Sequence, residues 1–188
     1  MARALHRSNA MLVYGGSRVG LMGEIARTLV ALSGPSSVLG IIPKPLKGLG
    51  QSHASHTTSG SDDDAAYGRI KVVKDMHTRK QYMAREVIAG GPGSGFITLS
   101  GGYGTLEELM EVITWNQLGI HNMPVVLFNV NGYWDGLLGW IQNAVKSGFV
   151  KPGNVDILSV GSSSEDVMDR LNEYQNARQR FGLTWEKL

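Results

Sequence analysis

The stretch Ser100-Gly101-Gly102-Tyr103-Gly104-Thr105-Leu106-Glu107-Glu108 decides the fold of this chain. It follows the apolar run 96–99, which is typical of a buried strand, and it leads into a helical pattern that runs from residue 105 to about 118. Glycines in such a turn let backbone N–H groups close around an anion, which the positive end of the helix dipole also attracts. We therefore expect a βα unit with an anion-binding turn.

Strand-like and helix-like segments alternate along the rest of the chain, which predicts an α/β fold with a mostly parallel sheet. Further strands are expected at 11–14, 38–42, 70–73, 124–128 and 155–160, and further helices at 20–32, 75–89, 133–147 and 165–178. Asp75 is expected to cap the second of these helices. With no internal repeat and no linker, residues 1–188 are expected to form one domain.

Two segments depart from this pattern. Residues 2–8 are typical of the end of a helix, whereas a doubly wound domain normally starts with a strand, so we expect the chain to begin inside its first βα unit. The alternative is a short N-terminal helix beside a smaller, complete sheet. Residues 44–68 are expected to form a mostly disordered flexible loop, part of which could act as a lid. His53 and His56 in this loop have no further ligand cluster, so no metal site is expected there.

The composition excludes several classes of protein. The 188 residues include no cysteine, which rules out disulfides, thiolate nucleophiles and cysteine metal sites and fits a cytoplasmic protein. There are 18 basic and 16 acidic residues with no basic run, so nucleic-acid binding is not expected. No apolar stretch approaches the roughly 20 residues that cross a bilayer, so no membrane association is expected.

The polar residues of the deciding stretch have two interpretations. Thr105 is expected to cap the helix and to donate to a phosphate oxygen. Glu107 and Glu108 are expected in the first helical turn, where carboxylates either favour the helix dipole or face a bound ligand. Neighbours on a helix point about 100° apart, so both cannot face a ligand equally, and either one shares a face better with Glu111. The turn taken alone leaves both interpretations open.

Two other segments resemble ligand-binding turns. In the stretch 75–83, Arg79 and Lys80 are poorly placed for the helix dipole, so they either face a phosphate or carboxylate or form a solvated surface pair. The stretch 14–23 is again strand, glycine turn and helix. It lacks both the Gly-x-Gly-x-x-Gly spacing and an acidic residue after the next strand, which disfavours NAD binding.

Together these segments resemble the LONELY GUY (LOG) family, in particular its fungal branch. The matching motifs are Tyr14-Gly15-Gly16 with Gly20-Leu21-Met22-Gly23, Met76-His77-x-Arg79-Lys80-x-x-Met83, and Gly101-Gly102-Tyr103-Gly104-Thr105-x-x-Glu108, followed by 114–121 and 129–133. The similarity runs from about residue 2 to residue 150. Ser100 stands where the family has proline, and the family's first strand with its Gly-Ser-Ser turn has no counterpart in this sequence.

The resemblance implies a Rossmann-like, doubly wound parallel sheet that lacks the family's first strand. It implies hydrolysis of cytokinin riboside 5′-monophosphates, or of AMP, to the free base and ribose 5-phosphate. Arg79 and Glu108 are then the expected catalytic residues, with Glu107 as a further candidate. The expected substrate contacts are Gly16, Met76, Lys80, Gly101, Gly102, Tyr103, Gly104 and Thr105. No metal or cofactor is expected, and the resemblance implies a homodimer or a larger homo-oligomer.

Other functions remain open at this point. A nucleotide-binding or carrier protein could use the same turn without hydrolysis, and a truncated, inactive paralogue could act only by assembling with other chains. The sequence does not decide between one cytokinin nucleotide, another and plain AMP. Members of the family have also been labelled lysine decarboxylases, but no lysine lies in a recognisable pyridoxal-phosphate context.

Overall fold

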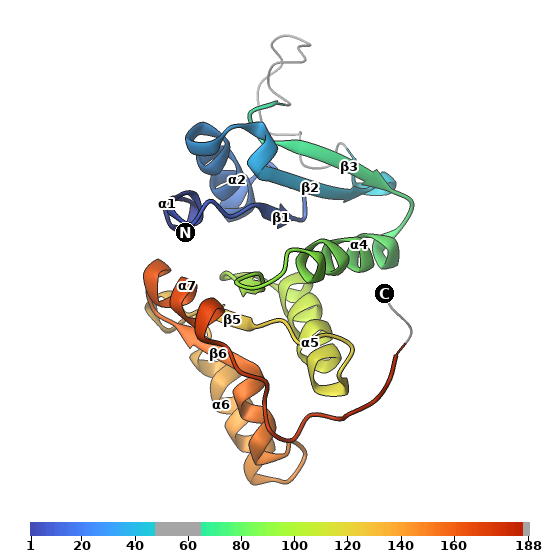
Figure 1. Ribbon diagram of the computed structural model, residues 1–188, viewed down its shortest axis with the longest axis vertical. Coiled ribbons are helices and arrows are strands. Elements are labelled where there is room, and N and C mark those ends of the chain that lie inside the picture. The colour runs from blue at the N-terminus through green and yellow to red at the C-terminus, as the bar shows by residue number, and fades with distance from the viewer. Residues whose placement is uncertain (48–64, 186–188) are drawn as a thin grey trace. The chain divides into compact units, whose positions relative to one another are not determined.

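The computed structural model describes residues 1–47 and 65–185. The described chain divides into two compact units, Met1–Glu86 and Val87–Leu188, and Figure 1 colours it from blue to red along its length. Each unit is an α/β structure built on a parallel sheet of three strands, with strand orders β1-β2-β3 and β4-β5-β6. The α/β class and the parallel strands predicted from the sequence are confirmed. The prediction that residues 1–188 form one domain stays a prediction.

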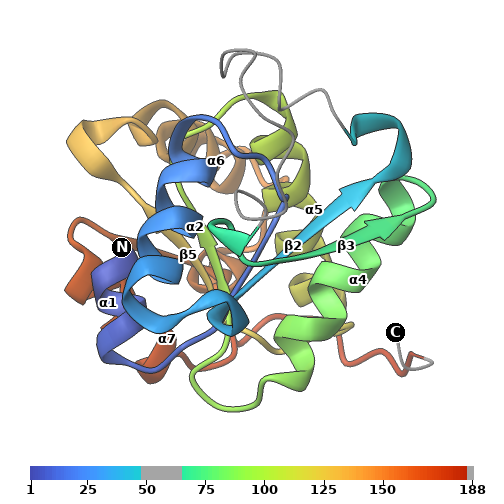
Figure 2. The same ribbon diagram turned by 90° about the horizontal axis from the view of Figure 1, so that it is seen from above.

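The first unit forms around β2, whose neighbours lie on both sides. Its elements are α1 (Ala2–Arg7), β1 (Leu12–Tyr14), α2 (Gly20–Ser33), η1 (Pro35–Ser37), β2 (Val38–Pro43), η2 (Lys44–Leu46), β3 (Arg69–Val73) and most of α4 (Met76–Ala89). Val38 and Ile41 of β2 are fully buried, as is Leu29 of α2. Figure 2 shows β2 and β3 running side by side, with Leu39 opposite Arg69. The apolar runs thus supply the core, and the carboxyl ends of β1 and β3 lead into the stretches 14–23 and 75–83, where the sequence predicted ligand-binding turns.

The second unit has the same plan, with β5 in the middle of its sheet. Its elements are β4 (Phe96–Thr98), α5 (Tyr103–Leu118), β5 (Val125–Phe128), η3 (Val130–Gly132), α6 (Asp135–Lys146), η4 (Pro152–Ile157), β6 (Leu158–Gly161) and α7 (Ser164–Glu173). Leu109, Val125, Leu127 and Trp134 form a buried apolar cluster. Because all three strands are parallel, the loops after β4 and β5 leave the same edge of the sheet.

Several predicted boundaries were wrong. Residues 155–157 belong to the 3₁₀ helix η4 rather than to a strand, because Pro152 at its start fixes a helical φ and the chain becomes extended only at Leu158. Helix α6 begins at Asp135 rather than at residue 133, after a turn in which Gly132 has a positive φ of 71°. Helix α7 ends at Glu173, since Tyr174 is extended with ψ of 134°.

Some predictions fall outside the described residues. His53, His56 and most of the predicted 44–68 loop belong to the segment 48–64, which the structure does not describe. In the described ranges, no helix is both long enough and apolar enough to cross a membrane.

Candidate functional site

The glycine-rich turn after β4 opens directly into α5. The helix begins at Tyr103 with Gly102 as its N-cap, and the N–H of Leu106 donates to the Gly102 carbonyl at 3.0 Å. The prediction that Thr105 caps the helix is therefore wrong, because Thr105 already lies inside the first turn. Its Oγ1 lies only 2.1 Å from where a Cβ on Gly101 would be, so a side chain at position 101 would collide with it. The structure thus brings Gly101 and Thr105 together.

The start of α5 is suited to an anion. The first N–H groups of any helix lack partners within the helix, and an N-cap side chain usually satisfies one of them. Gly102 has no side chain and cannot do so. Gly102, Tyr103 and Gly104 are exposed, and the Tyr103 side chain is 93% exposed. These backbone donors, together with the helix dipole, can bind a phosphate group.

The carbonyl group of Gly101, in the same turn, is hydrogen-bonded by a residue of the loop after β5. The hydroxyl of Tyr133, which lies between η3 and α6, donates to the carbonyl oxygen of Gly101 at 2.7 Å. The Tyr133 ring packs edge-on against Trp134 with 4.9 Å between ring centroids. Trp134 is 3% exposed and belongs to the apolar cluster of the second unit. The loops after β4 and β5 are therefore joined at the edge of the sheet.

The two glutamates occupy different surroundings on α5. Because the helix begins at Tyr103, two residues earlier than expected, Glu107 and Glu108 lie in its second turn, and the prediction of a first-turn position is wrong. The helix dipole acts mainly within the first turn, so it gives a weaker reason for these carboxylates. Glu107 is exposed, whereas Glu108 is half-buried beside the fully packed Leu109. Of the pair, Glu108 is the less exposed residue.

Helix α4 of the first unit is capped as expected. The N–H of Thr78 donates to Oδ1 of Asp75 at 2.7 Å, and this backbone hydrogen bond lowers the pKa of the Asp75 carboxyl. Met76 at the start of the helix is 41% exposed, and Lys80 is half-buried. The cap fixes where the helix begins and so fixes the direction of the residue one turn later, Arg79.

Arg79 is a buried side chain, only 9% exposed. Its Nε donates to the carbonyl oxygen of Ile41 in β2 at 3.1 Å. Its Nη2 lies 2.2 Å from where a Cβ on Gly15 would be, so the guanidinium rests against the backbone of the turn after β1. The interpretation of Arg79 as part of a solvated surface pair is therefore wrong. A buried guanidinium held in a fixed direction is suited to binding a carboxylate or a phosphate.

Two contributors to these sites were missed in the sequence. Gly16 was the predicted contact of the first turn, but Gly15 is the residue that makes room for Arg79, while Gly16, with φ of 77°, lies against Ile42. Tyr133 was noted only as part of a stretch similar to the family. Its position at the end of a loop after a central strand was the available signal. The roles of Gly16, Met76 and Lys80 in binding stay predictions.

The site residues divide between the two units. Arg79 and Gly15 belong to the first unit, and Glu108, Gly101 and Tyr133 to the second. Among the described residues, no group of three or more histidine, aspartate or glutamate side chains could hold a metal ion.

Comparison with known proteins identifies the family to which the chain is similar. A family model described as "Possible lysine decarboxylase" matches residues 22–171. A bifunctional cytokinin biosynthesis protein of Fusarium pseudograminearum is 50% identical over 187 residues, which are 98% of this chain but 38% of that protein. A probable cytokinin riboside 5′-monophosphate phosphoribohydrolase of Oryza sativa subsp. japonica is 40% identical, over 99% of this chain and 80% of its own length. A cytokinin riboside 5′-monophosphate phosphoribohydrolase of Arabidopsis thaliana is 41% identical, over 95% of this chain and 75% of its own length.

Proposed function

The chain belongs to the LOG family of cytokinin riboside 5′-monophosphate phosphoribohydrolases, and on this premise we propose that it hydrolyses such nucleotides to the free base and ribose 5-phosphate. The bond cleaved joins C1′ of the ribose to N9 of an adenine that is N6-substituted, or unsubstituted in AMP. The observation that carries this proposal is the start of α5, where a helix N-terminus without a side-chain cap precedes the half-buried Glu108.

The phosphate is assigned to the backbone of the turn from Gly101 to Thr105. The N–H groups of Gly102, Tyr103 and Gly104 supply donors, and the Thr105 hydroxyl can supply another. The helix dipole favours the negative charge of the phosphate. Support comes from the exposure of these glycines and from the close approach of Thr105 to Gly101. Substrate contacts are also assigned to Gly16, Met76 and Lys80, on the strength of the family resemblance.

The chemical step is assigned to Glu108, with Glu107 as the less favoured candidate. As the bond from C1′ to N9 breaks, positive charge develops on the ribose ring, as in glycoside hydrolysis. A carboxylate near C1′ stabilises that charge and can accept a proton from the attacking water. The oxygen of that water becomes bonded to C1′, and the bonding electrons leave with the base, which is protonated. The partial burial of Glu108 supports this choice, because a less hydrated carboxylate interacts more strongly with a developing charge.

Arg79 is assigned as the second catalytic residue. Its guanidinium is buried and held by the Ile41 carbonyl, so its direction is fixed before any ligand binds. Such a group can anchor the nucleotide or orient a carboxylate without losing much side-chain entropy on binding. The assignments of Arg79 and Glu108 concern different units of the chain and are tested by separate variants.

The assembly and the compartment are part of the same proposal. The family resemblance supports a homodimer or a larger homo-oligomer, and the absence of cysteine fits the cytoplasm. Light scattering on the purified protein would give the size of the assembly.

The test of the function is release of the base. The protein is incubated with isopentenyladenosine monophosphate or AMP, and chromatography measures free base and ribose 5-phosphate in equal amounts. A nucleotide carrier would bind the substrate and release neither product. That outcome would overturn the proposed hydrolysis.

A further inference from the structure

Tyr133 occupies the end of a loop whose shape is fixed by its own hydrogen bonds. The N–H of Asn129 donates to the Gly161 carbonyl of β6 at 2.9 Å, so the loop starts as an extension of the sheet. The Asn129 side chain then holds the end of the loop, because its Oδ1 accepts from the N–H of Trp134 and its Nδ2 donates to Asp135, each at 2.8 Å. Such a loop can hold a side chain in one place.

The turn within this loop requires unusual backbone angles. Asn131 and Gly132 both have positive φ, of 52° and 71°, a conformation that asparagine and glycine adopt more readily than other residues. A Cβ on Gly132 would lie 2.5 Å from the Asp135 carboxylate, so the turn is tightly closed against the start of α6. Next to Tyr133, Trp134 is buried in the apolar cluster of the second unit and so fixes this end of the loop to the core.

The contact that Tyr133 makes bears on the direction of a phosphate donor. Its hydroxyl donates to the Gly101 carbonyl oxygen at 2.7 Å. In a planar trans peptide, the C=O of one residue and the N–H of the next point in opposite directions. The hydrogen bond to Gly101 therefore also fixes the direction of the Gly102 N–H. Glycines on both sides of this peptide would otherwise let it rotate more freely than any other pair of residues.

We infer that Tyr133 is a positioning residue of the phosphate site, which holds the peptide between Gly101 and Gly102 so that the Gly102 N–H is ready for the phosphate. This inference rests on the proposed function, because it takes the glycine-rich turn as the place of the substrate phosphate. It extends that function to a residue 32 positions further along the chain. Tyr133 acts through the backbone and needs no contact with the substrate.

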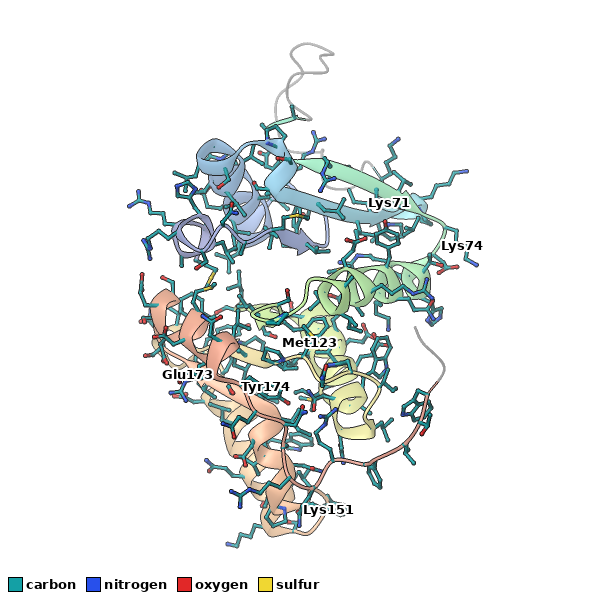
Figure 3. The ribbon with its side chains drawn as sticks, viewed as in Figure 1. Lys71, Lys74, Met123, Lys151, Glu173 and Tyr174 are labelled. Carbon is teal, nitrogen blue, oxygen red and sulfur yellow. The ribbon has the colours of Figure 1, made fainter. Side chains whose placement is uncertain are left out.

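The test removes one hydroxyl group and leaves the ring. Tyr133→Phe keeps the edge-on contact with Trp134 but loses the hydrogen bond to Gly101. Tyr174→Phe is the matched control, since it makes the same change in the same unit and loses a hydrogen bond from Asn116 at 3.0 Å. Figure 3 labels Tyr174 near Met123, whose carbonyl oxygen Asn116 also contacts. Circular dichroism and thermal melts establish that both variants fold.

The affinities for the two parts of the substrate, ribose 5-phosphate and the free base, are then measured separately. For Tyr133→Phe, we expect the KM for AMP and the inhibition constant of ribose 5-phosphate to rise by about three- to tenfold, the loss typical of one hydrogen bond. The inhibition constant of the free base and kcat should each change by less than about twofold. Tyr174→Phe should leave the affinity for ribose 5-phosphate unchanged.

The possible results separate this inference from the proposed function. Unchanged binding of ribose 5-phosphate by Tyr133→Phe would overturn the positioning role, as would an equal loss of affinity for base and sugar phosphate or the same loss in Tyr174→Phe. If the wild-type protein releases no base, the proposed hydrolysis fails. Calorimetric titration of ribose 5-phosphate into both variants would still test the role of Tyr133.

Discussion

Arg79 of α4 donates from its Nε to the carbonyl oxygen of Ile41 in β2, at 3.1 Å. This hydrogen bond ties the buried guanidinium to the last part of a central strand, and the turn after β1 closes over it. A side chain at Gly15 would have its Cβ 2.2 Å from Nη2 of Arg79. Position 15 is therefore where the placement of Arg79 can be changed without altering Arg79 itself.

Gly15→Ala should displace the Arg79 guanidinium and lower kcat/KM for AMP by roughly 10²-fold, because a shift of about 1 Å in a catalytic group can cost that much. The matched control is Gly139→Ala, where a Cβ meets nothing within 4 Å and alanine favours the helix. Steady-state kinetics on both variants check the prediction. Normal turnover by Gly15→Ala would mean that the position of Arg79 does not matter for the reaction.

Glu108→Gln should lower kcat by about 10²–10⁴-fold, since glutamine neither accepts a proton nor stabilises a positive charge in the same way. Nucleotide binding should largely survive, because the phosphate is assigned to the backbone of the turn. The control is Glu107→Gln. Glu107 is exposed and points about 100° away from Glu108, so this change should cost less than about tenfold. Near-normal release of isopentenyladenine by Glu108→Gln would show that another group performs the chemical step.

Nucleosides should be poor substrates compared with their monophosphates. Leaving the donors at the start of α5 without their charged partner is expected to cost about 2–5 kcal/mol. The kcat/KM for isopentenyladenosine should therefore be at least about 30-fold lower than for isopentenyladenosine monophosphate. Parallel assays of the two compounds measure this ratio, and comparable values would favour an ordinary nucleosidase.

The local sequence predicted most of the strands and turns but not the contacts between distant residues. The apolar runs at β2 and β5 were recognisable because most residues of these strands are buried, as the complete burial of Val125 and Val126 in β5 shows. The start of α5 was placed two residues late, because Gly104 is a poor helix former and Thr105 resembles an N-cap residue. The helix propensities of single residues therefore gave the wrong N-terminal boundary for α5.

Arg79 shows why the rest could not be predicted. From its own helix, it was no better explained as a ligand contact than as a solvated residue. Its burial depends on the Ile41 carbonyl, 38 positions away in the sequence, and on the absence of a side chain at Gly15. The hydroxyl contact of Tyr133 likewise spans 32 positions. The spacing of apolar residues within one helix or strand does not show which residue of another element a side chain will contact.

His121, which is 4% exposed, should make the stability depend on pH. Its Nδ1 accepts from the N–H of Met123 at 3.1 Å, so its Nε2 carries the proton that bonds the Val112 carbonyl. Burial, with a smaller contribution from the nearby charge of Arg180, lowers the pKa of His121 from 6.5 to about 4, although the bond to Val112 acts in the opposite direction. Protonation would remove the acceptor for Met123.

Between about pH 6.5 and pH 4, the unfolded chain therefore binds a proton at His121 that the folded chain does not. The contribution to stability is fully present above about pH 6.5 and is lost as the pH falls toward 4, by about 3 kcal/mol in all. Urea unfolding at several pH values measures it. His121→Gln should flatten the curve in this range even if it is less stable at pH 7. An unchanged slope in that variant would contradict the prediction.

The segment after α7 should stabilise the C-terminal end of α5. The last carbonyl groups of a helix lack partners within it, and a positive charge there favours the dipole. Arg180 meets both needs, since its Nε donates to the Asn116 carbonyl at 2.7 Å and its Nη2 donates to the His121 carbonyl. The Phe181 N–H and Trp185 Nε1 donate to the next carbonyls, those of Gln117 and Leu118.

Arg180→Ala should therefore lower the free energy of unfolding by about 2–4 kcal/mol, because hydrogen bonds from a charged donor are each worth about 1.5–3 kcal/mol. Arg180→Lys should recover only part of this loss, since an ammonium group keeps the charge but cannot reproduce the forked geometry. The exposed Arg178→Ala is the matched control and should change stability by less than about 0.5 kcal/mol. Urea unfolding monitored by tryptophan fluorescence compares the three. Equal stability of Arg180→Ala and Arg178→Ala would show that α5 ends without help from this segment.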